Sequence, residues 1–204
     1  MTEMMTKPAF TRAEPDARRL SLIEATARVL ARQGAAGVSV RVIALEAGVS
    51  PGLVNHYFDG IDALIAATYA HVDAQVSAAF DAAIAAAGPE PRGRLLAHVT
   101  ASFAPPIADP GLLATWIAFW SLVKSNTGIA RLHRDLYAGY RRDLELLLAA
   151  CGVADSERRL AAIGISALVD GLWLELCLAP DAFTPAEASR IATHYIDGLV
   201  GEGA

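Results

Sequence analysis

The chain has 204 residues, a length that permits one large domain or two smaller ones. Apolar residues make up 54% of it and charged residues 19%, which excludes an intrinsically disordered chain. The net charge of −5 argues against a protein that coats nucleic acid non-specifically. Residues 1–60 nevertheless carry a net charge of +1 and residues 61–204 carry −6, so the N-terminal part is the better suited to face DNA.

Nothing in the sequence indicates export or a membrane anchor. Met1–Arg12 lacks the apolar segment of a signal peptide. Cys151 and Cys177 are far apart and form no metal-binding or redox motif, so we expect a reduced, cytoplasmic protein without metal or cofactor. The most apolar stretch, Ala161–Leu178, contains two acidic residues and is predicted to be a buried core helix, not a membrane span.

Hydrophobic spacing and the positions of glycine and proline predict an all-α fold, because no segment alternates as a strand does. A flexible arm is expected over residues 1–15, followed by a helix from Asp16 to Gln33 that Gly34 ends. Ser39 is placed to cap a short helix ending near Ala47, and Ser50 with Pro51 to start another ending near Phe58. Longer helices are expected at Ile61–Ala87, Arg92–Phe103, Gly111–Ser125, Ile129–Ala150, Asp155–Leu178 and Pro185–Val200.

The two short helices flank the tight turn Ala47-Gly48-Val49, which is the pattern of a helix-turn-helix. Apolar side chains are expected to lock the two helices together: Val42, Ile43, Leu45, Val49, Leu53 and Val54. Short polar and aromatic side chains on the other face could hydrogen-bond phosphates or base edges. The same pattern also occurs in ordinary helical hairpins, so the turn alone leaves both interpretations open.

A longer signature favours DNA binding. One run of residues resembles, in its order and spacing, the DNA-binding signature of the TetR family of transcriptional regulators. It comprises Gly34, Ser39-Val40-Arg41, Ile43-Ala44, Ala47-Gly48-Val49-Ser50, Gly52 and Phe58. The resemblance implies an N-terminal three-helix helix-turn-helix domain over residues 16–60, followed over 61–204 by a helical domain that binds a small ligand and forms a homodimer.

The resemblance also implies roles for single residues. Those expected to contact operator DNA are Ser39, Val40, Arg41, Ser50, Pro51, Gly52, Asn55, His56 and Tyr57. The family usually has a lysine three residues after the phenylalanine, where it anchors a phosphate. Ile61 stands there in this chain, so we expect that phosphate contact to be lost.

Within the family, the segments Thr115–Trp120 and Ala167–Leu174 resemble the BetI branch, which regulates choline and glycine-betaine metabolism. Aromatic faces attract organic cations and a buried carboxylate adds opposite charge, so a choline-like cation is a plausible effector. The residues expected to bind it are Trp116, Phe119, Trp120, Tyr137, Tyr140, Asp170 and Trp173. The alternative remains open that these aromatics are plain core and that Asp170 packs or caps a helix beside Gly171, which would permit close helix approach.

Other functions fit the sequence less well. The five histidines are scattered and form no pair on one helix face, and no nucleophile elbow, phosphate loop or zinc pattern is present, which argues against an enzyme. A helical carrier or interaction protein would share the C-terminal features without needing a helix-turn-helix. The most consistent prediction is a regulator, in the family usually a repressor, that binds a pseudo-palindromic operator as a dimer and is released by a small molecule.

Overall fold

The computed structural model describes residues 13–201, and its regular structure within that range is entirely helical. The N-terminal elements are α1 (Ala13–Gln33), the 3-10 turn η1 (Ala35–Gly37), α2 (Val40–Glu46) and α3 (Pro51–Tyr57). The remaining elements are α4 (Gly60–Ala86), α5 (Pro91–Thr100), η2 (Ala101–Phe103), α6 (Pro110–Leu122), α7 (Thr127–Ala150), α8 (Asp155–Leu178) and α9 (Pro185–Val200). The all-α prediction is confirmed.

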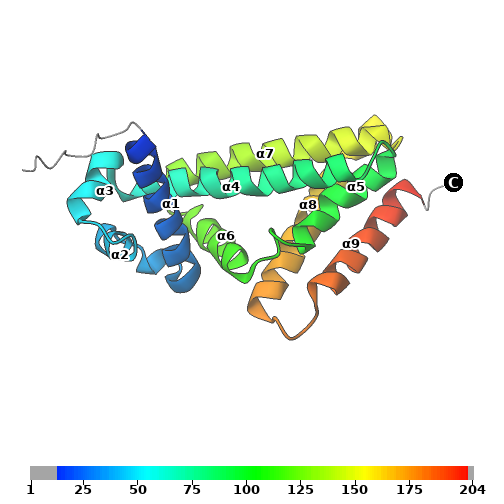
Figure 1. Cartoon of the computed structure of the whole chain (residues 1–204). Coiled ribbons are helices and arrows are strands. Elements are labelled where there is room, and N and C mark those ends of the chain that lie inside the picture. The colour runs from blue at the N-terminus through cyan, green and yellow to red at the C-terminus, as the bar shows by residue number, and fades with distance from the viewer. Residues whose placement is uncertain (1–12, 202–204) are drawn as a thin grey trace, which may run out of the picture.

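The helices enclose two hydrophobic cores. The smaller core lies among α1, α2, α3 and the start of α4, and Ile23, Ile43 and Val54 are buried in it. The larger core lies among α4 to α9 and includes Tyr69, Phe119 and Trp173. We call α1 to α3 the N-terminal head and α4 to α9 the C-terminal body. The long helix α4 starts at the head and continues beside α7 into the body (Figure 1). Because α4 contributes to both cores, a displacement of this helix in the body is transmitted to the head.

Helix α1 provides a second connection between the two parts. It packs against α2 and α4 in the head and also against α6 in the body. Leu30 of α1 is completely buried and belongs to the larger core. The head is therefore held to the body by α6 as well as by the continuous helix α4.

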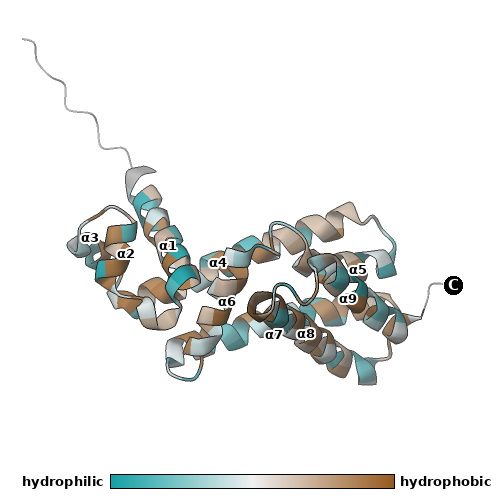
Figure 2. Ribbon diagram, turned by 90° about the horizontal axis from the view of Figure 1, so that it is seen from below, coloured by the Kyte–Doolittle hydropathy of each residue, from teal (hydrophilic) through white to brown (hydrophobic). Residues whose placement is uncertain are grey.

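Hydrophobic residues are prominent on α6 and α8 (Figure 2). Helix α8 is long and apolar enough to cross a membrane by length and composition alone, and core helices of soluble proteins commonly meet the same criterion. Its buried side chains, among them Ile165, Val169 and Trp173, belong to the larger core. One side of α8 therefore lies in the core, as predicted, whereas its other side is exposed.

The opposite sides of α8 and α9 expose a continuous apolar stripe. On α8 it comprises Leu160, Ile163, Ala167, Gly171, Leu174 and Leu178, and on α9 it comprises Ile191, Tyr195 and Leu199. Residues three and four apart on a helix share one face, so each set forms a single seam. An apolar surface of this kind marks an interaction site rather than a solvated face.

Three local expectations differ from the structure. Helix α1 begins at Ala13, within the segment expected to be a flexible arm, while residues 1–12 of that arm lie outside the described range. Leu45 was expected to lock α2 against α3, but it is 84% exposed because Ile43 and Ala44 take the inward positions. Gly171 was expected to permit a close helix approach, but no helix of the described chain makes it, because a Cβ there would meet no atom within 4 Å; inside the chain the close approach is at Gly164, whose Cβ would collide with the Tyr195 hydroxyl.

Candidate functional site

The helix-turn-helix begins with a capped helix. Ser39 precedes α2 and its hydroxyl accepts a hydrogen bond from the Val42 amide at 3.3 Å, which confirms its predicted capping role. Gly48 makes the turn with a φ of 66°, a conformation that favours glycine. Ser50 occupies the N-cap position of α3, but its side chain makes no capping hydrogen bond, so a capping role for Ser50 like that of Ser39 is not confirmed. Pro51 occupies the first turn of α3, where a missing N–H has no cost. These local preferences hold α3 at a fixed angle to α2.

The predicted DNA-contacting residues lie on one accessible surface of the head. Six of them are exposed: Ser39, Arg41, Ser50, Pro51, Gly52 and Asn55. His56 is also exposed and packs edge-on against Tyr57, with ring centroids 5.1 Å apart. Val40 and Tyr57 are half-buried and pack against the smaller core. The inward positions of α3 belong to Val54 and, just after it, to Phe58, so the polar side chains are left free to meet a ligand.

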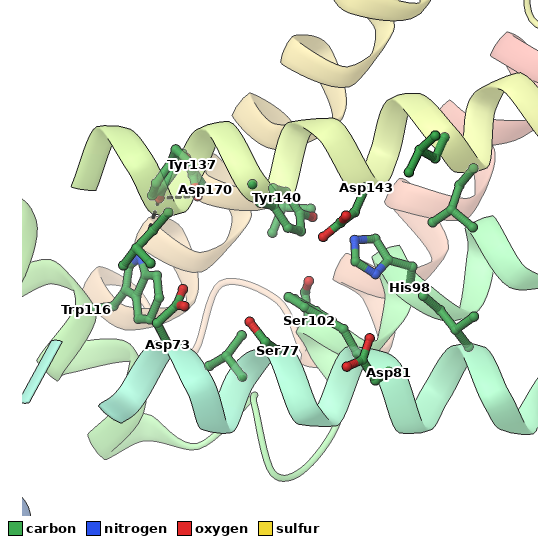
Figure 3. A pocket seen from close by; sticks show the side chains of 18 of the residues that line it. Asp73, Ser77, Asp81, His98, Ser102, Trp116, Tyr137, Tyr140, Asp143 and Asp170 are labelled. Carbon is green, nitrogen blue, oxygen red and sulfur yellow. Dashed lines mark hydrogen bonds between the residues drawn. The ribbon is translucent and has the colours of Figure 1, made fainter. Parts of the chain in front are cut away.

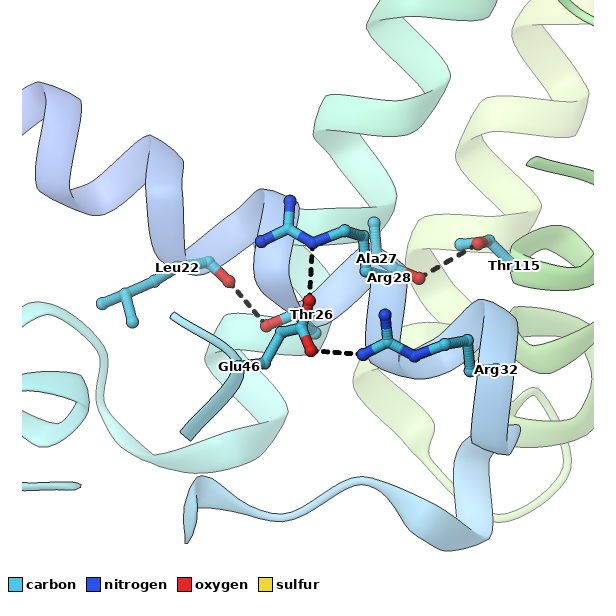
Figure 4. Close-up of polar contacts among 7 residues, drawn as sticks. All are labelled: Leu22, Thr26, Ala27, Arg28, Arg32, Glu46 and Thr115. Carbon is cyan, nitrogen blue, oxygen red and sulfur yellow. Dashed lines mark hydrogen bonds and ion pairs between the residues drawn. The ribbon is translucent and has the colours of Figure 1, made fainter. Parts of the chain in front are cut away.

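Helix α2 is braced against α1 by an acidic side chain between two arginines (Figure 4). The Arg28 Nε donates to the Glu46 Oε1 at 2.7 Å, and Arg32 pairs with the other carboxylate oxygen. The Arg28 hydrogen bond, followed by that from Arg32, lowers the pKa of Glu46. These two ion pairs hold the C-terminal end of α2 against α1, although exposed ion pairs contribute little to the free energy of unfolding.

Ile61 lies in the first turn of α4 and is half-buried. Its side chain packs against both hydrophobic cores, at the junction of the head and the body. The position expected to lose a phosphate-binding lysine therefore carries an apolar contact that joins the two parts of the chain. Its side chain can offer no charge to a phosphate.

The C-terminal body contains a cavity of about 450 Å³ between α4 and α7 (Figure 3). Helices α5, α6 and α8 complete its wall. Five of the seven predicted ligand-binding residues line it: Trp116, Tyr137, Tyr140, Asp170 and Trp173. The volume falls within the range of small-molecule sites.

A hydrogen-bond network centres on the Tyr137 hydroxyl, at the end of the cavity nearer the head. This hydroxyl donates to Asp170 Oδ1 at 3.0 Å. It accepts from the indole nitrogens of Trp120 at 3.0 Å and Trp116 at 3.4 Å. The network joins α6, α7 and α8 and fixes the orientation of the Asp170 carboxylate relative to the aromatic rings.

The two remaining predicted residues do not line the cavity. Phe119 is completely buried and stacks on Tyr69, with ring centroids 4.2 Å apart. Trp120 is half-buried and reaches the site only through its hydrogen bond to Tyr137. The structure thus separates these two residues, which support the wall, from the five whose side chains form it.

Burial disfavours the charged form of the Asp170 carboxyl. It raises the pKa of the Asp170 carboxyl to about 6, although the hydrogen bond from Tyr137 and the charge of Arg141 oppose the rise. Burial also raises the pKa of Asp73, which lies near Trp116 at the same end (Figure 3). A bound cation would relieve both carboxylates of this penalty, because opposite charge favours the ionised form.

Sequence reasoning missed the other end of the cavity. Asp81 of α4, His98 of α5 and Asp143 of α7 lie there (Figure 3). His98 is only 2% exposed, and burial lowers its pKa to about 4. A signal was present in the sequence, because Asp73, Ser77 and Asp81 recur every four residues and form one polar face of α4.

Two family profiles match the chain. Residues 22–68 match the bacterial regulatory proteins of the tetR family, and residues 91–201 match the C-terminal domain of BetI-type transcriptional repressors. The HTH-type transcriptional regulator BetI of Paraburkholderia phymatum is 35% identical over 194 residues, which cover 93% of this chain and 96% of that protein. These relatives are regulators and not enzymes.

Solved structures share the fold. A putative transcriptional regulator from Pseudomonas aeruginosa PAO1 superposes with a TM-score of 0.83 at 46% identity, over 92% of each chain. A putative transcriptional regulator from Saccharomonospora viridis, solved in complex with choline, superposes with a TM-score of 0.78 at 21% identity, over 92% of this chain and all of that one. The chain belongs to the TetR family of transcriptional regulators, with a DNA-binding helix-turn-helix followed by a BetI-type C-terminal domain.

Proposed function

We propose that the protein is a cytoplasmic repressor that binds a pseudo-palindromic operator as a homodimer and releases it when a small organic cation enters the cavity between α4 and α7. The acidic, aromatic cavity carries this proposal. Asp170 is fixed by Tyr137 at 3.0 Å and shares the cavity with Trp116, Tyr140 and Trp173, so the site offers both cation–π attraction and a counter-charge.

The DNA contact is proposed for α3 and the N-terminal end of α2. Helix α3 would enter the major groove, where Asn55, His56 and Tyr57 have the donors and acceptors that read base edges. Ser39 and Arg41 at the start of α2 would contact phosphates, which position the head without reading sequence. The exposure of Asn55, His56 and Arg41 supports these assignments.

The dimer contact is proposed for the apolar stripe on α8 and α9. Two copies related by a two-fold axis would pack this stripe against itself as a four-helix bundle. Gly171 and Gly198 are exposed and have open space around them, so they would let the partner's helices approach closely. A two-fold dimer also presents two α3 helices to two half-sites one turn of DNA apart, about 34–36 Å.

The effector class is proposed on chemistry and on the relatives. The S. viridis regulator was solved with choline, and the curated relatives are BetI regulators. A choline-like ammonium would lie against Trp116 and Trp173, beside Asp170 and Asp73. The alternative that the aromatic residues are simply core applies to Phe119, whereas Trp116 and Trp173 belong to the core and also line the cavity.

DNA binding is tested with the promoter upstream of the protein's own gene in a gel-shift experiment. Substitution His56→Ala removes an exposed side chain and should weaken binding by about 1–3 kcal/mol while leaving helicity unchanged. Substitution Gln75→Ala, at an exposed position of α4 away from the head, serves as the matched control. Equal binding by His56→Ala, Tyr57→Ala and the parent would contradict the placement of α3 in the groove.

Release is tested with choline, betaine aldehyde and the uncharged isostere 3,3-dimethylbutan-1-ol. The two cations should dissociate the operator complex, and the neutral isostere should not at the same concentration. Asp170→Asn should abolish the difference between the cations and the isostere. If the isostere releases the operator as well as choline does, the cavity recognises shape alone and the cationic effector is wrong.

A further inference from the structure

The cavity is longer than one small ammonium group requires. Asp73 and Asp81 both line it from α4 and are eight residues apart, about 12 Å along the helix axis. Asp73 lies near Trp116 and the Tyr137–Asp170 pair, and Asp81 lies near Asp143 and His98 (Figure 3). A single quaternary ammonium at the aromatic end would not reach the second pair of carboxylates.

The negative charge of the cavity lining favours a ligand with more than one positive group. Five aspartates line the cavity: Asp73, Asp81, Asp135, Asp143 and Asp170. The cations near them are Arg94, which also lines it, and Arg141 and Arg142, whose charges oppose the pKa rises of Asp170 and Asp143. The buried His98 adds no compensating charge at neutral pH, because burial keeps its ring uncharged. Burial and, after it, the charge of Asp81 raise the pKa of Asp143, while the charge of Arg142 lowers it, so the two carboxylates repel each other. A cation between them would remove that repulsion.

Two buried polar side chains at the same end of the cavity, His98 and Ser102, have no hydrogen-bond partner within the described residues. Neither ring nitrogen of His98 has a partner within residues 13–201, although its side chain is 98% buried and packs against Phe80 and Tyr140. The hydroxyl of the fully buried Ser102, which also lines the cavity, has none either. A neutral imidazole carries one acceptor nitrogen, which an N–H donor can satisfy. Primary and secondary ammonium groups have N–H donors, whereas a quaternary ammonium has none.

We propose that the cavity takes an elongated polycation with N–H donors, a linear diamine or polyamine. One ammonium group lies at the aromatic end beside Trp116 and Asp170, and the other lies among Asp81, His98 and Asp143. The alkyl chain between them runs along Phe80 and Tyr140. The inference deepens the proposed function by naming the effector class, and it rests on that function only in treating the cavity as the effector site.

Isothermal titration calorimetry on the full-length protein without DNA tests the assignment, with spermidine as the polyamine and choline as the single-ended cation. Spermidine should bind the parent at least about tenfold more tightly than choline, because it gains a second charged hydrogen-bonded contact. The double variant Asp81→Asn, Asp143→Asn should lose about that tenfold advantage and keep its choline affinity. Both positions are exposed on one side, so the variant should fold as the parent does.

The matched control is Glu145→Gln combined with Asp181→Asn, which removes two acidic charges outside the cavity. It should bind spermidine as the parent does, which separates a local contact from the overall charge. The assignment is overturned if choline binds as tightly as spermidine, if spermidine does not bind, or if the two double variants behave alike.

A gel-shift with the parent and the cavity double variant distinguishes this inference from the proposed function. Both receive the same spermidine concentrations, so any direct effect of the polyamine on DNA is equal in the two. Release from the parent alone supports the inference and the function together. Tight spermidine binding without release would contradict the proposed regulation and leave the ligand class intact.

Discussion

The single hydroxyl hydrogen of Thr115 on α6 is shared between two carbonyl oxygens, that of Ala27 on α1 at 3.2 Å and that of Gly111 in its own helix at 2.8 Å (Figure 4). Thr115 is buried and directly precedes Trp116, which lines the cavity. Ala27 lies one residue before Arg28, whose pairing with Glu46 braces α2. A displacement of Trp116 by a ligand therefore has a short route of packed and hydrogen-bonded groups to the DNA-reading head. Helix α4, which contributes to both cores, offers a parallel route.

Substitution Thr115→Val should weaken the coupling between the two sites. Valine keeps the volume but removes the hydroxyl, and the shared cross-helix hydrogen bond contributes about 0.5 kcal/mol, or a factor of about two. Operator affinity and cation affinity, each measured alone by fluorescence anisotropy and calorimetry, should change little. The cation concentration needed to release the operator should rise. Thr115→Ser keeps the hydroxyl and serves as the control, and an unchanged release curve for Thr115→Val would show that α6 does not transmit the signal.

Substitution Ile61→Lys should restore a phosphate contact at the start of α4. Operator affinity should increase, and the slope of log affinity against log salt concentration should steepen by about 1. Loss of the apolar contact between the two cores should lower the free energy of unfolding by about 1 kcal/mol. Ile61→Gln loses the same packing without adding charge and should show only the destabilisation. A salt slope equal in both variants would mean that residue 61 does not face the backbone of DNA.

Substitution Gly171→Leu should prevent dimer formation without disturbing the chain itself. The position is exposed and a Cβ there meets no atom within 4 Å, so a single chain tolerates the larger side chain. In the proposed interface the leucine would hold the partner's helices apart. Analytical ultracentrifugation should show a dimer for the parent and for the control Ala85→Leu, and a monomer for Gly171→Leu. A dimeric Gly171→Leu variant would place the two-fold contact on another surface.

Substitution Asp170→Asn should stabilise the ligand-free protein at neutral pH. The folded-state pKa of Asp170 is raised to about 6 from an ordinary value of 3.8, so the folded state holds its proton more tightly than the unfolded state. Stability therefore falls as pH rises through the window from about 4 to about 6. Thermal unfolding should give the variant the higher Tm at pH 7.5, with a difference that shrinks toward pH 4. A lower Tm for the variant at pH 7.5 would show that the charged carboxylate is favoured by its surroundings.

Local chemistry explains why most of the fold could be predicted from the sequence. Gly34 and Gly48 adopt φ values of 64° and 66°, and Ser39 caps α2, because each preference is decided within a few residues. The exposure of Leu45 could not be predicted in the same way. Its spacing fits an inward position, but Ile43 and Ala44 take the buried positions of α2.

Only the aromatic end of the cavity could be predicted from the sequence. Trp116, Asp170 and Trp173 were found because their residue types point to cation binding and their segments resemble the BetI branch. The acidic end depends on Asp81, His98 and Asp143, which come from three helices and meet only when α4, α5 and α7 pack together. The four-residue spacing of Asp73, Ser77 and Asp81 marks a polar face of α4, but no spacing along the chain shows that His98 and Asp143 meet it. Phe119 has the same residue type as a cavity aromatic but turns into the core, which a one-dimensional pattern cannot decide.

The proposed regulation requires that the cation and the operator favour different conformations, so each must weaken the binding of the other by the same factor. All three tryptophans lie at the cavity or one hydrogen bond from it, so their fluorescence reports cation binding directly. The decisive measurement is a fluorescence titration of choline into the free protein and into its operator complex. We predict weaker choline binding to the complex, by the factor by which saturating choline weakens operator binding. Equal choline affinity for the free and the operator-bound protein would contradict regulation through this cavity.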